Sequence, residues 1–321
     1  MSVSEVRVKA GYRIHLGFYR YLDGGLAYGA IGLSVEEPYL EVRAIKTAES
    51  DEASINAPTE ESLEAVKRVV KYLAASPANL MITGYVRHHV GLGSITRLYL
   101  ASAVALSTLH RRIDLNLEDL LVKLGRCRYS CIGYYTFLYG GLAVDIGAPL
   151  GQVGTIPKPL ALAKFPRSWY VVIAVPEGRG LREEEEDPYL RSPTPVDEQR
   201  NLYKALVEVL SGVKMERLDL FTQGVETIQR VAGNYFSKAQ GGVFSSKYGE
   251  EVARVMLESG LRGVGQSSWG PAIYGFTDSY SVAESARRSI LRVLDRLGVS
   301  CDVWVSRGAE LGYSMQVLHL R

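Results

Sequence analysis

Hydrophobic residues recur along this chain with two periods, which predict strands and helices in alternation. Residues 3–15 place Val6 and Val8 on one side and Arg7 and Lys9 on the other, which is typical of a strand with one buried face. Residues 58–61 (Pro-Thr-Glu-Glu) combine a proline, a threonine that can cap a helix and an acidic first turn, so a helix should follow them.

The same two periods predict the remaining elements. Further strands are expected at residues 26–34, 39–44, 79–85, 140–145, 169–175, 272–276, 302–305 and 315–319. Further helices are expected at residues 95–109, 117–124, 196–210, 220–232, 248–259 and 281–297. Because helices and strands are interspersed, the pattern indicates an α/β or α+β class in two layers. The glycine- and proline-rich segment 147–166 is the expected boundary between two domains, 1–160 and 161–321.

Composition narrows the class of protein. The 321 residues include 37 Lys and Arg against 35 Asp and Glu, and a net charge of +2 lacks the basic excess of a dedicated nucleic-acid binder. No stretch approaches the ~20 apolar residues of a membrane span, and we expect no secretory leader because the first residues are already charged. Three cysteines are a sparse, odd set, so we expect no disulfide framework and a reducing, cytoplasmic environment.

One candidate phosphate site is the segment Gly91-Leu92-Gly93-Ser94, between an expected strand and an expected helix. Glycines let the backbone approach a phosphate closely, and a helix start offers unpaired N–H groups at the positive end of its dipole. Arg97 would add a cationic donor to the same place. The alternative is an ordinary glycine turn with Ser94 as the helix N-cap.

A second candidate is the loop that carries Arg126, Arg128 and Ser130. The planar guanidinium fork of arginine matches phosphate or carboxylate groups with two hydrogen bonds. A solvated connection is the alternative. Cys127 and Cys131 in this loop lack a second pair at zinc spacing, so we expect small, buried residues there and no metal site.

The segment 265–271 (Gly-Gln-Ser-Ser-Trp-Gly-Pro) has an unusual composition. It places the polar side chains of Gln266, Ser267 and Ser268 beside Trp269. Loops of this kind suit a ligand that carries both a polar group and a ring. A tryptophan that fills the core between a strand and a helix is the alternative.

Two single residues and one acidic run complete the candidates. Asp145, at the end of an expected strand, is either a carboxylate in a site or the partner of an arginine. His15 is either a general acid–base or phosphate ligand, or a half-buried histidine with its hydrogen bonds satisfied. The run 183–186 is expected to be a solvated loop, with a mobile, metal-recruiting lid as the alternative.

Taken together, these segments resemble a known family. The strand–GLGS–helix unit resembles the phosphate-binding motif of the GHMP kinase superfamily. Within it, the ordered set of motifs resembles the archaeal beta-ribofuranosylaminobenzene 5'-phosphate synthase family over nearly the whole chain. That set is Arg-Ile-His at 13–15, then 91–96, 125–133, 140–145, Gln-Gly-Gly at 240–242, and 265–271, the most specific of the six.

The resemblance implies a fold, a reaction and a cofactor. The fold is α+β, with a ribosomal-S5-like N-terminal domain and a ferredoxin-like C-terminal domain. The reaction condenses phosphoribosyl pyrophosphate with 4-aminobenzoate and releases CO2 and pyrophosphate, an early step toward methanopterin-type carriers. Mg2+ would screen the pyrophosphate, and no organic cofactor is expected.

Roles for individual residues follow from that reaction. The glycine loop would hold one phosphate, and Arg126 or Arg128 a second phosphate or the acceptor's carboxylate. Trp269 would line the slot for the aromatic ring, with the residues before it orienting the ring. Catalysis would rest on positioning and charge stabilisation, and the candidate catalytic groups are Asp145 and His15.

Two other functions are compatible with the same fold. One is a small-molecule kinase that uses ATP at the glycine loop, and the other is a non-catalytic protein that binds a phosphorylated metabolite. In each case we expect small-molecule ligands, with no nucleic acid and no membrane, and a homodimer is an oligomeric state that the sequence allows.

The chain also departs from the expected family pattern. Ile95 stands where a small residue usually follows the GLGS motif, and Arg97 stands where a neutral amide is expected. Cys127 and Cys131 replace expected glycines in the loop 125–133.

Overall fold

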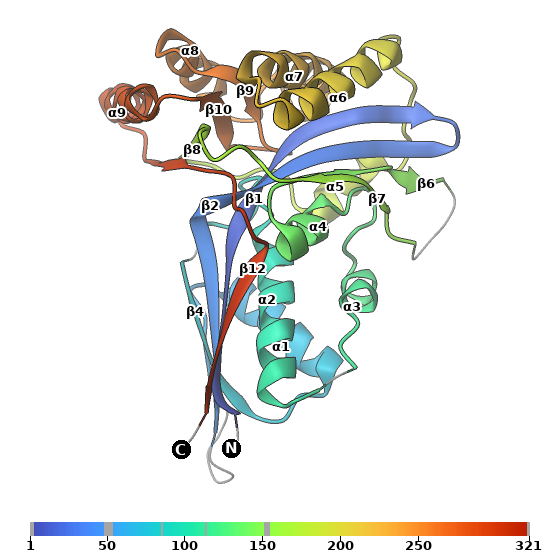
Figure 1. The fold of residues 1–321 in the computed structure, drawn as a ribbon, viewed down its shortest axis with the longest axis vertical. Helices are drawn as coiled ribbons and strands as arrows, with labels where there is room; N and C mark the ends of the chain where they lie inside the picture. The colour runs from blue at the N-terminus through green and yellow to red at the C-terminus, as the bar shows by residue number, and fades with distance from the viewer. Residues whose placement is uncertain (1–2, 48–53, 85, 113, 151–154, 320–321) are drawn as a thin grey trace.

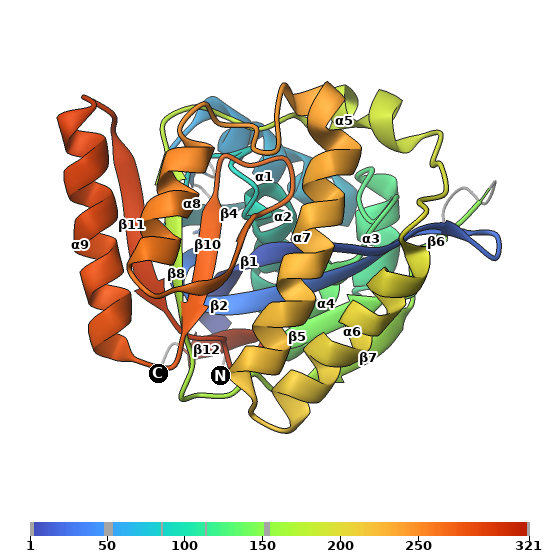
Figure 2. The same ribbon diagram turned by 90° about the horizontal axis from the view of Figure 1, so that it is seen from above.

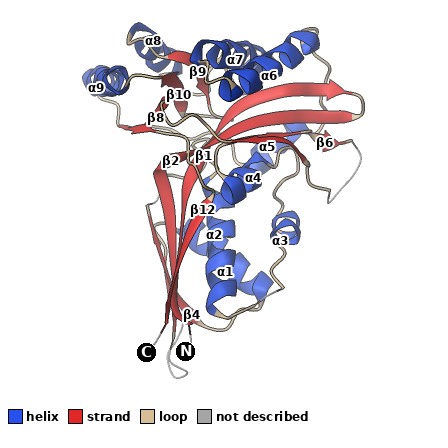
Figure 3. Cartoon of the chain, viewed as in Figure 1, coloured by secondary structure: helices blue, strands red, loops and turns tan. Residues whose placement is uncertain are grey.

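The computed structural model describes residues 3–47, 54–84, 86–112, 114–150 and 155–319. Two sheets organise these residues, and helices pack against both (Figures 1 and 3). The expected α+β class is confirmed, because the strand pairs are antiparallel apart from one short parallel pair. Among the described helices, none has the length and apolar character needed to cross a membrane.

The first sheet is built on a long hairpin of β1 (Val3–Asp23) and β2 (Leu26–Lys46). Both strands are longer than the hydrophobic pattern predicts. Irregular register at three places between residues 11 and 20 lets β1 bend and continue. In Figure 1 the hairpin rises from the two termini and then bends beneath the helices α6 and α7.

The other strands of the first sheet come from distant parts of the chain. They are β3 (Ile55–Asn56), β4 (Ala78–Thr83), β5 (Leu142–Asp145), β6 (Ala148–Pro149), β7 (Pro159–Ala163) and β12 (Tyr313–His319). The last of these pairs with β1, so a segment of the expected domain 161–321 lies in the first sheet. The division into 1–160 and 161–321 stays a prediction.

Four helices accompany the first sheet: α1 (Glu60–Leu73), α2 (Ser94–Leu109), α3 (Leu117–Lys123) and α4 (Ile132–Tyr139). The predicted cap of α1 is confirmed, because the Thr59 side chain accepts a hydrogen bond from the Ser62 N–H. Helix α2 is buried along almost its whole length between the sheet and its helical neighbours. The hydrophobic pattern does not predict helix α4, whose residues follow a glycine-flanked loop.

The second sheet has the strand order β11-β8-β10-β9. These strands are β8 (Tyr170–Pro176), β9 (Arg262–Gln266), β10 (Ile273–Thr277) and β11 (Cys301–Ser306). The other described helices are α5 (Glu183–Leu190), α6 (Gln199–Lys214), α7 (Leu218–Gln240), α8 (Gly249–Glu258) and α9 (Tyr280–Arg296). Figure 2 shows α6 and α7 side by side, with α8 and α9 against the strands.

Strand β8 of the second sheet contributes side chains to two hydrophobic cores. Its residues alternate between the two faces of the sheet, as the period of a strand requires. Val172 and Ala174 join the core that α8 and α9 cover, whereas Val171 and Ile173 join the large core shared with the first sheet. The shared core fixes the two sheets against each other, and the candidate site lies where they meet.

Candidate active site

A cavity of about 400 Å³ lies between the glycine loop, the bend after β9 and helices α5 and α7. Its basic and polar wall comes from β1, the glycine loop and the loop before α4. Its apolar wall comes from β1, α5, α7 and the bend. The predicted candidates that line it are His15, Gly91, Gly93, Ser94, Arg126, Arg128, Ser130, Gln266, Ser268 and Trp269.

The glycine loop and the tryptophan-bearing bend contact each other directly. The Ser267 hydroxyl donates to the Gly91 carbonyl at 2.7 Å, and the Ala272 N–H donates to the Val90 carbonyl at 3.1 Å. A Cβ at Gly91 would lie 2.1 Å from the Ser267 carbonyl oxygen, and Gly91 has a φ of +90°. These two segments, distant in the sequence, therefore converge beside one cavity, and glycine is required where they meet.

The side chain of Ser267 connects the bend to the glycine loop and to β1, and it does not line the cavity. Its side chain is fully buried, and its hydroxyl oxygen also accepts a hydrogen bond from the His15 N–H at 2.8 Å. The expected contact of Ser267 with an aromatic substrate is thus replaced by a structural one. Its neighbour Gln266 plays a similar part, because its side chain accepts from the Ser245 N–H and donates to the Ser268 carbonyl.

Arg13 places a positive charge in contact with the glycine loop. Its guanidinium donates to the Gly91 carbonyl at 2.8 Å, while its buried Nε has no partner among the described residues. Burial lowers the pKa of Arg13 to about 10, and the nearby Glu186 carboxylate opposes that shift, so the group stays charged at neutral pH. Sequence reasoning gives Arg13 no role, although it belongs to the Arg-Ile-His motif.

The start of α2 differs from the expected cap. Gly93, in the left-handed region, is the N-cap and Ser94 is the first helical residue, so Ser94 makes no cap hydrogen bond. Its hydroxyl instead contacts Nδ1 of His88 at 2.8 Å, and Nε2 of His88 contacts the Ser62 hydroxyl at 2.7 Å. Burial lowers the pKa of His88 to about 4, so a neutral imidazole links the two serines.

His15 lies in the cavity wall as a neutral group. Burial and the neighbouring Arg13 charge hold the pKa of His15 well below its ordinary value. Its Nδ1 accepts a hydrogen bond from the Gly17 N–H at 3.0 Å, so the ring proton must sit on Nε2. At neutral pH His15 can therefore donate one hydrogen bond through Nε2.

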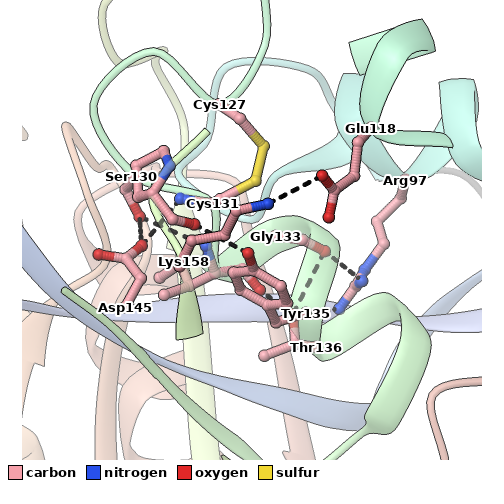
Figure 4. Close-up of a disulfide and its surroundings, with 12 residues drawn as sticks. Arg97, Glu118, Cys127, Ser130, Cys131, Gly133, Tyr135, Thr136, Asp145 and Lys158 are labelled. Carbon is pink, nitrogen blue, oxygen red and sulfur yellow. Dashed lines mark hydrogen bonds and ion pairs between the residues drawn. A yellow bond between two sulfur atoms is a disulfide. The ribbon is translucent and has the colours of Figure 1, made fainter. Parts of the chain in front are cut away.

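Two other residues expected in the phosphate site belong to the core instead. Arg97 is only 1% exposed, and it donates to the Gly133 carbonyl at 2.8 Å and to the Thr136 hydroxyl at 2.9 Å (Figure 4). Burial lowers its pKa to about 9. Leu92 is a buried core residue that contributes only its carbonyl, which accepts from the Arg13 N–H. The sequence predicts both as phosphate contacts because they lie next to the glycines along the chain.

Asp145 lies behind the cavity wall and not in it. Its carboxylate accepts hydrogen bonds from the Cys131 N–H and the Ser130 hydroxyl (Figure 4). It also accepts hydrogen bonds from the N–H groups of Ala30 and Gly147. Burial raises its pKa to about 6, and the four hydrogen bonds limit that rise. The expectation that Asp145 is catalytic is corrected by this position, which makes it an anchor for the loop before α4.

The cysteines of that loop form a disulfide, contrary to expectation. Cys127 is bonded to Cys131, and Cys127 also lines the cavity (Figure 4). The spacing of four residues gives no signal for this pair, because the bond requires a tight turn that the sequence does not reveal. Among the described residues no group of three or more His, Cys, Asp or Glu is placed to hold a metal.

The apolar end of the cavity is aromatic. Trp269, 7% exposed, lies against Phe236 with ring centroids 4.7 Å apart, and the ring centroid of Tyr189 lies 5.8 Å from that of Trp269. Phe18 packs 6.2 Å from Phe236. Trp269 is thus a core residue that also lines the cavity, and the ligand contact expected of it stays a prediction.

The acidic run begins a helix and not a loop. Residues 183–190 form α5, from which Glu186 and Leu190 line the cavity. On the same helix, Asp187 accepts a hydrogen bond from the Tyr129 hydroxyl at 2.6 Å and pairs with Arg128 at 2.8 Å. Helix α5 is therefore a wall of the cavity that is attached to the loop before α4.

Comparisons with known proteins agree with this architecture. No family model matches the chain. It is 29% identical to a beta-ribofuranosylphenol 5'-phosphate synthase of Archaeoglobus fulgidus, over 97% of this chain and all of the relative. A protein of the same name from Methanocaldococcus jannaschii is 24% identical, over 94% of this chain and 98% of the relative.

Solved structures identify the fold. The homoserine kinase of Cytophaga hutchinsonii matches with a TM-score of 0.68 at 17% identity, over 98% of both chains. The mevalonate diphosphate decarboxylase of Staphylococcus aureus matches with a TM-score of 0.63 at 14% identity, again over 98% of both chains. The expected resemblance is confirmed: the chain is similar over nearly its whole length to beta-ribofuranosylphenol 5'-phosphate synthases, and its fold is that of the GHMP kinases.

Proposed function

We propose that the protein is a pentosyltransferase that joins the phosphoribosyl group of phosphoribosyl pyrophosphate to a 4-substituted benzoate. The sequence resemblance favours 4-aminobenzoate as the acceptor. The names of the relatives favour an acceptor with a hydroxyl group in place of the amine, because their product is a ribofuranosylphenol 5'-phosphate. Both acceptors share a flat ring, a carboxylate and an electron-donating group opposite it.

The reaction balances without an oxidant or a nucleophilic side chain. The bond between C1 of the ribose and pyrophosphate breaks, and C1 bonds to the ring carbon that bears the carboxylate. That carboxylate then leaves as CO2, and the electrons of its bond to the ring restore the aromatic system. The para amine or hydroxyl supplies electron density to the attacking carbon.

The observation that supports this proposal is that one cavity has a basic end and an aromatic end. Arg13 and Arg126, with the N–H groups at the start of α2, would bind the pyrophosphate and stabilise its charge as it leaves. Phe236 and Trp269 would contact the ring of the acceptor. Neutral His15 would donate a hydrogen bond through Nε2 and add no positive charge beside a cationic ribosyl centre.

Mg2+ remains part of the proposal. It would arrive with the pyrophosphate and screen its charge, and it commonly takes only one or two carboxylates from the protein. Two carboxylates line the cavity, those of Glu186 and Glu226. The donor set fits a metal that is bound mainly by substrate.

Carboxyl-labelled acceptors test the proposal directly. We expect the wild-type protein to release labelled CO2 from 4-aminobenzoate or 4-hydroxybenzoate only when phosphoribosyl pyrophosphate is present. We expect a Ser94→Ala, Arg126→Ala double variant to lose binding of phosphoribosyl pyrophosphate, while a Cys301→Ser variant, changed outside the cavity, should keep it. Phosphate transfer from ATP without CO2 release would identify a kinase, and ligand binding without turnover a sensor; either result would reject the transferase.

A further inference from the structure

The Cys127–Cys131 disulfide closes a tight turn whose other residues form one wall of the cavity. Cys127 has a φ of +60°, in the left-handed region that glycine favours. From this turn Arg128, Tyr129 and Ser130 line the cavity, as does Arg126 just before it. The covalent bond thus holds a strained backbone position at the place where two guanidinium groups, a phenol and a serine hydroxyl line the ligand space.

The turn is attached to the molecule on both sides of the disulfide. On one side, the buried Asp145 carboxylate accepts from the Ser130 hydroxyl at 3.0 Å and from the Cys131 N–H at 2.8 Å. On the other side, Asp187 of α5 binds both Arg128 and Tyr129. The disulfide adds a second covalent link, besides the backbone, to the turn that contacts both Asp145 and α5.

Helix α5 in turn presents Glu186 and Leu190 to the cavity. If the turn relaxes, Arg128 and Tyr129 leave Asp187, and α5 loses two of the contacts that hold it beside the ligand space. The geometry of the basic wall and the position of α5 therefore depend on the same turn.

We propose that the Cys127–Cys131 disulfide is a positioning element of the anion-binding end of the cavity, and that its reduction weakens the binding of pyrophosphate-bearing ligands. This inference rests on the proposed pyrophosphate site. In the reduction, a dithiol supplies two electrons and two protons through thiol–disulfide exchange: the Cys127–Cys131 bond breaks, two thiols form, and the dithiol becomes a disulfide.

The burial of the two sulfur-bearing residues gives the inference a second consequence. Cys131 is 1% exposed, whereas Cys127 is 9% exposed and lines the cavity. A small dithiol therefore reaches the bond through the ligand space, by attack at Cys127. A ligand that fills this space should slow the reduction.

The first experiment measures binding of inorganic pyrophosphate by titration calorimetry to air-oxidised and dithiothreitol-reduced protein, with mass spectrometry to verify each state. We expect the reduced protein to bind about tenfold more weakly, because the ligand must then order the turn itself. A Cys127→Ser, Cys131→Ser variant should match the reduced protein and no longer respond to dithiothreitol. The Cys301→Ser variant, in which only the cysteine of β11 is changed, should behave as wild type.

The second experiment measures the rate of reduction by dithiothreitol with and without saturating pyrophosphate. We expect several-fold protection in wild type, an effect that a disulfide with a merely structural role elsewhere would not show. In turnover, loss of the disulfide should raise the KM for phosphoribosyl pyrophosphate more than it raises the KM for the benzoate. Circular dichroism on the Cys127→Ser, Cys131→Ser variant should show the native fold.

Several results would overturn the inference. The first is that Cys127 and Cys131 stay reduced after the protein is exposed to air. The second is that the oxidised and the reduced protein bind pyrophosphate with equal affinity. The third is that dithiothreitol reduces the disulfide at the same rate with and without pyrophosphate. Failure of the proposed function looks different: pyrophosphate binding would remain and respond to redox state, while no CO2 is released from either benzoate.

Discussion

Acidification should destabilise the protein through His88, and the size of the effect follows from its environment. The imidazole is 9% exposed, and its two nitrogens contact the hydroxyls of Ser62 and Ser94. Burial lowers its pKa from 6.5 to about 4, although Glu61 opposes that change. Because a tenfold change in proton affinity corresponds to about 1.4 kcal/mol, the neutral form is favoured in the native state by about 3 kcal/mol.

The direction follows from where the proton binds. A histidine with a lowered native pKa takes up its proton more readily when the chain is unfolded. Its contribution to stability is therefore complete above pH 6.5 and is lost as the pH falls toward 4. His88→Gln is the matched change, because glutamine can also bridge two hydroxyls but does not titrate.

Urea unfolding of both proteins, followed by circular dichroism between about pH 7 and 4, measures the difference in the free energy of unfolding. We expect the wild type to lose about 3 kcal/mol more than His88→Gln across this range. Groups present in both proteins, including Asp145 with its raised pKa, cancel in that difference. Parallel curves for the two proteins would show that His88 is protonated in the native state without cost, and would refute the neutral bridge.

Three substitutions test other parts of the site. Gly91→Ala should lower the free energy of unfolding by at least about 2 kcal/mol and weaken pyrophosphate binding, because the Cβ of the new alanine would overlap the Ser267 carbonyl. An unchanged melting temperature and an unchanged affinity would contradict the close contact. Trp269→Ala should lower the free energy of unfolding in urea by about 3–5 kcal/mol. It should also raise the KM for the benzoate at least about tenfold and leave the affinity for pyrophosphate unchanged. An unchanged KM would exclude Trp269 from the ring slot. Arg97→Met should lower the free energy of unfolding by about 3 kcal/mol, because it leaves the buried Gly133 carbonyl without its donor. The affinity for pyrophosphate should stay within about twofold of wild type. A large loss of affinity would show that Arg97 does contact the phosphate site.

Local signals predict most of the described helices, but not α4 or α5. The cap at Thr59 and the hydrophobic stripe after it place α1 correctly, because both features lie within one short window. Helices α2, α8 and α9 also lie within a few residues of their expected positions. The class of fold follows from the interspersed pattern, and the GHMP architecture follows from the resemblance.

Features that depend on distant parts of the chain could not be predicted. The length of β1 depends on register irregularities that only its partner strand reveals. Arg97 resembles a phosphate ligand from its place beside the glycine loop, but α2 is buried and turns this side chain to Gly133 and Thr136. The position of Asp145 behind the cavity wall could not be predicted for a similar reason: the sequence shows a carboxylate at a strand end, not the four donors that surround it.

While the chain is being synthesised, β1 lacks a neighbour along one of its edges. Its partner there, β12, begins only at Tyr313, so nearly all the described residues must leave the ribosome before the pair can form. An open, partly apolar strand edge can pair with another copy of itself. Nascent or truncated chains that lack β12 should therefore be the species most prone to aggregate, and the most in need of a chaperone.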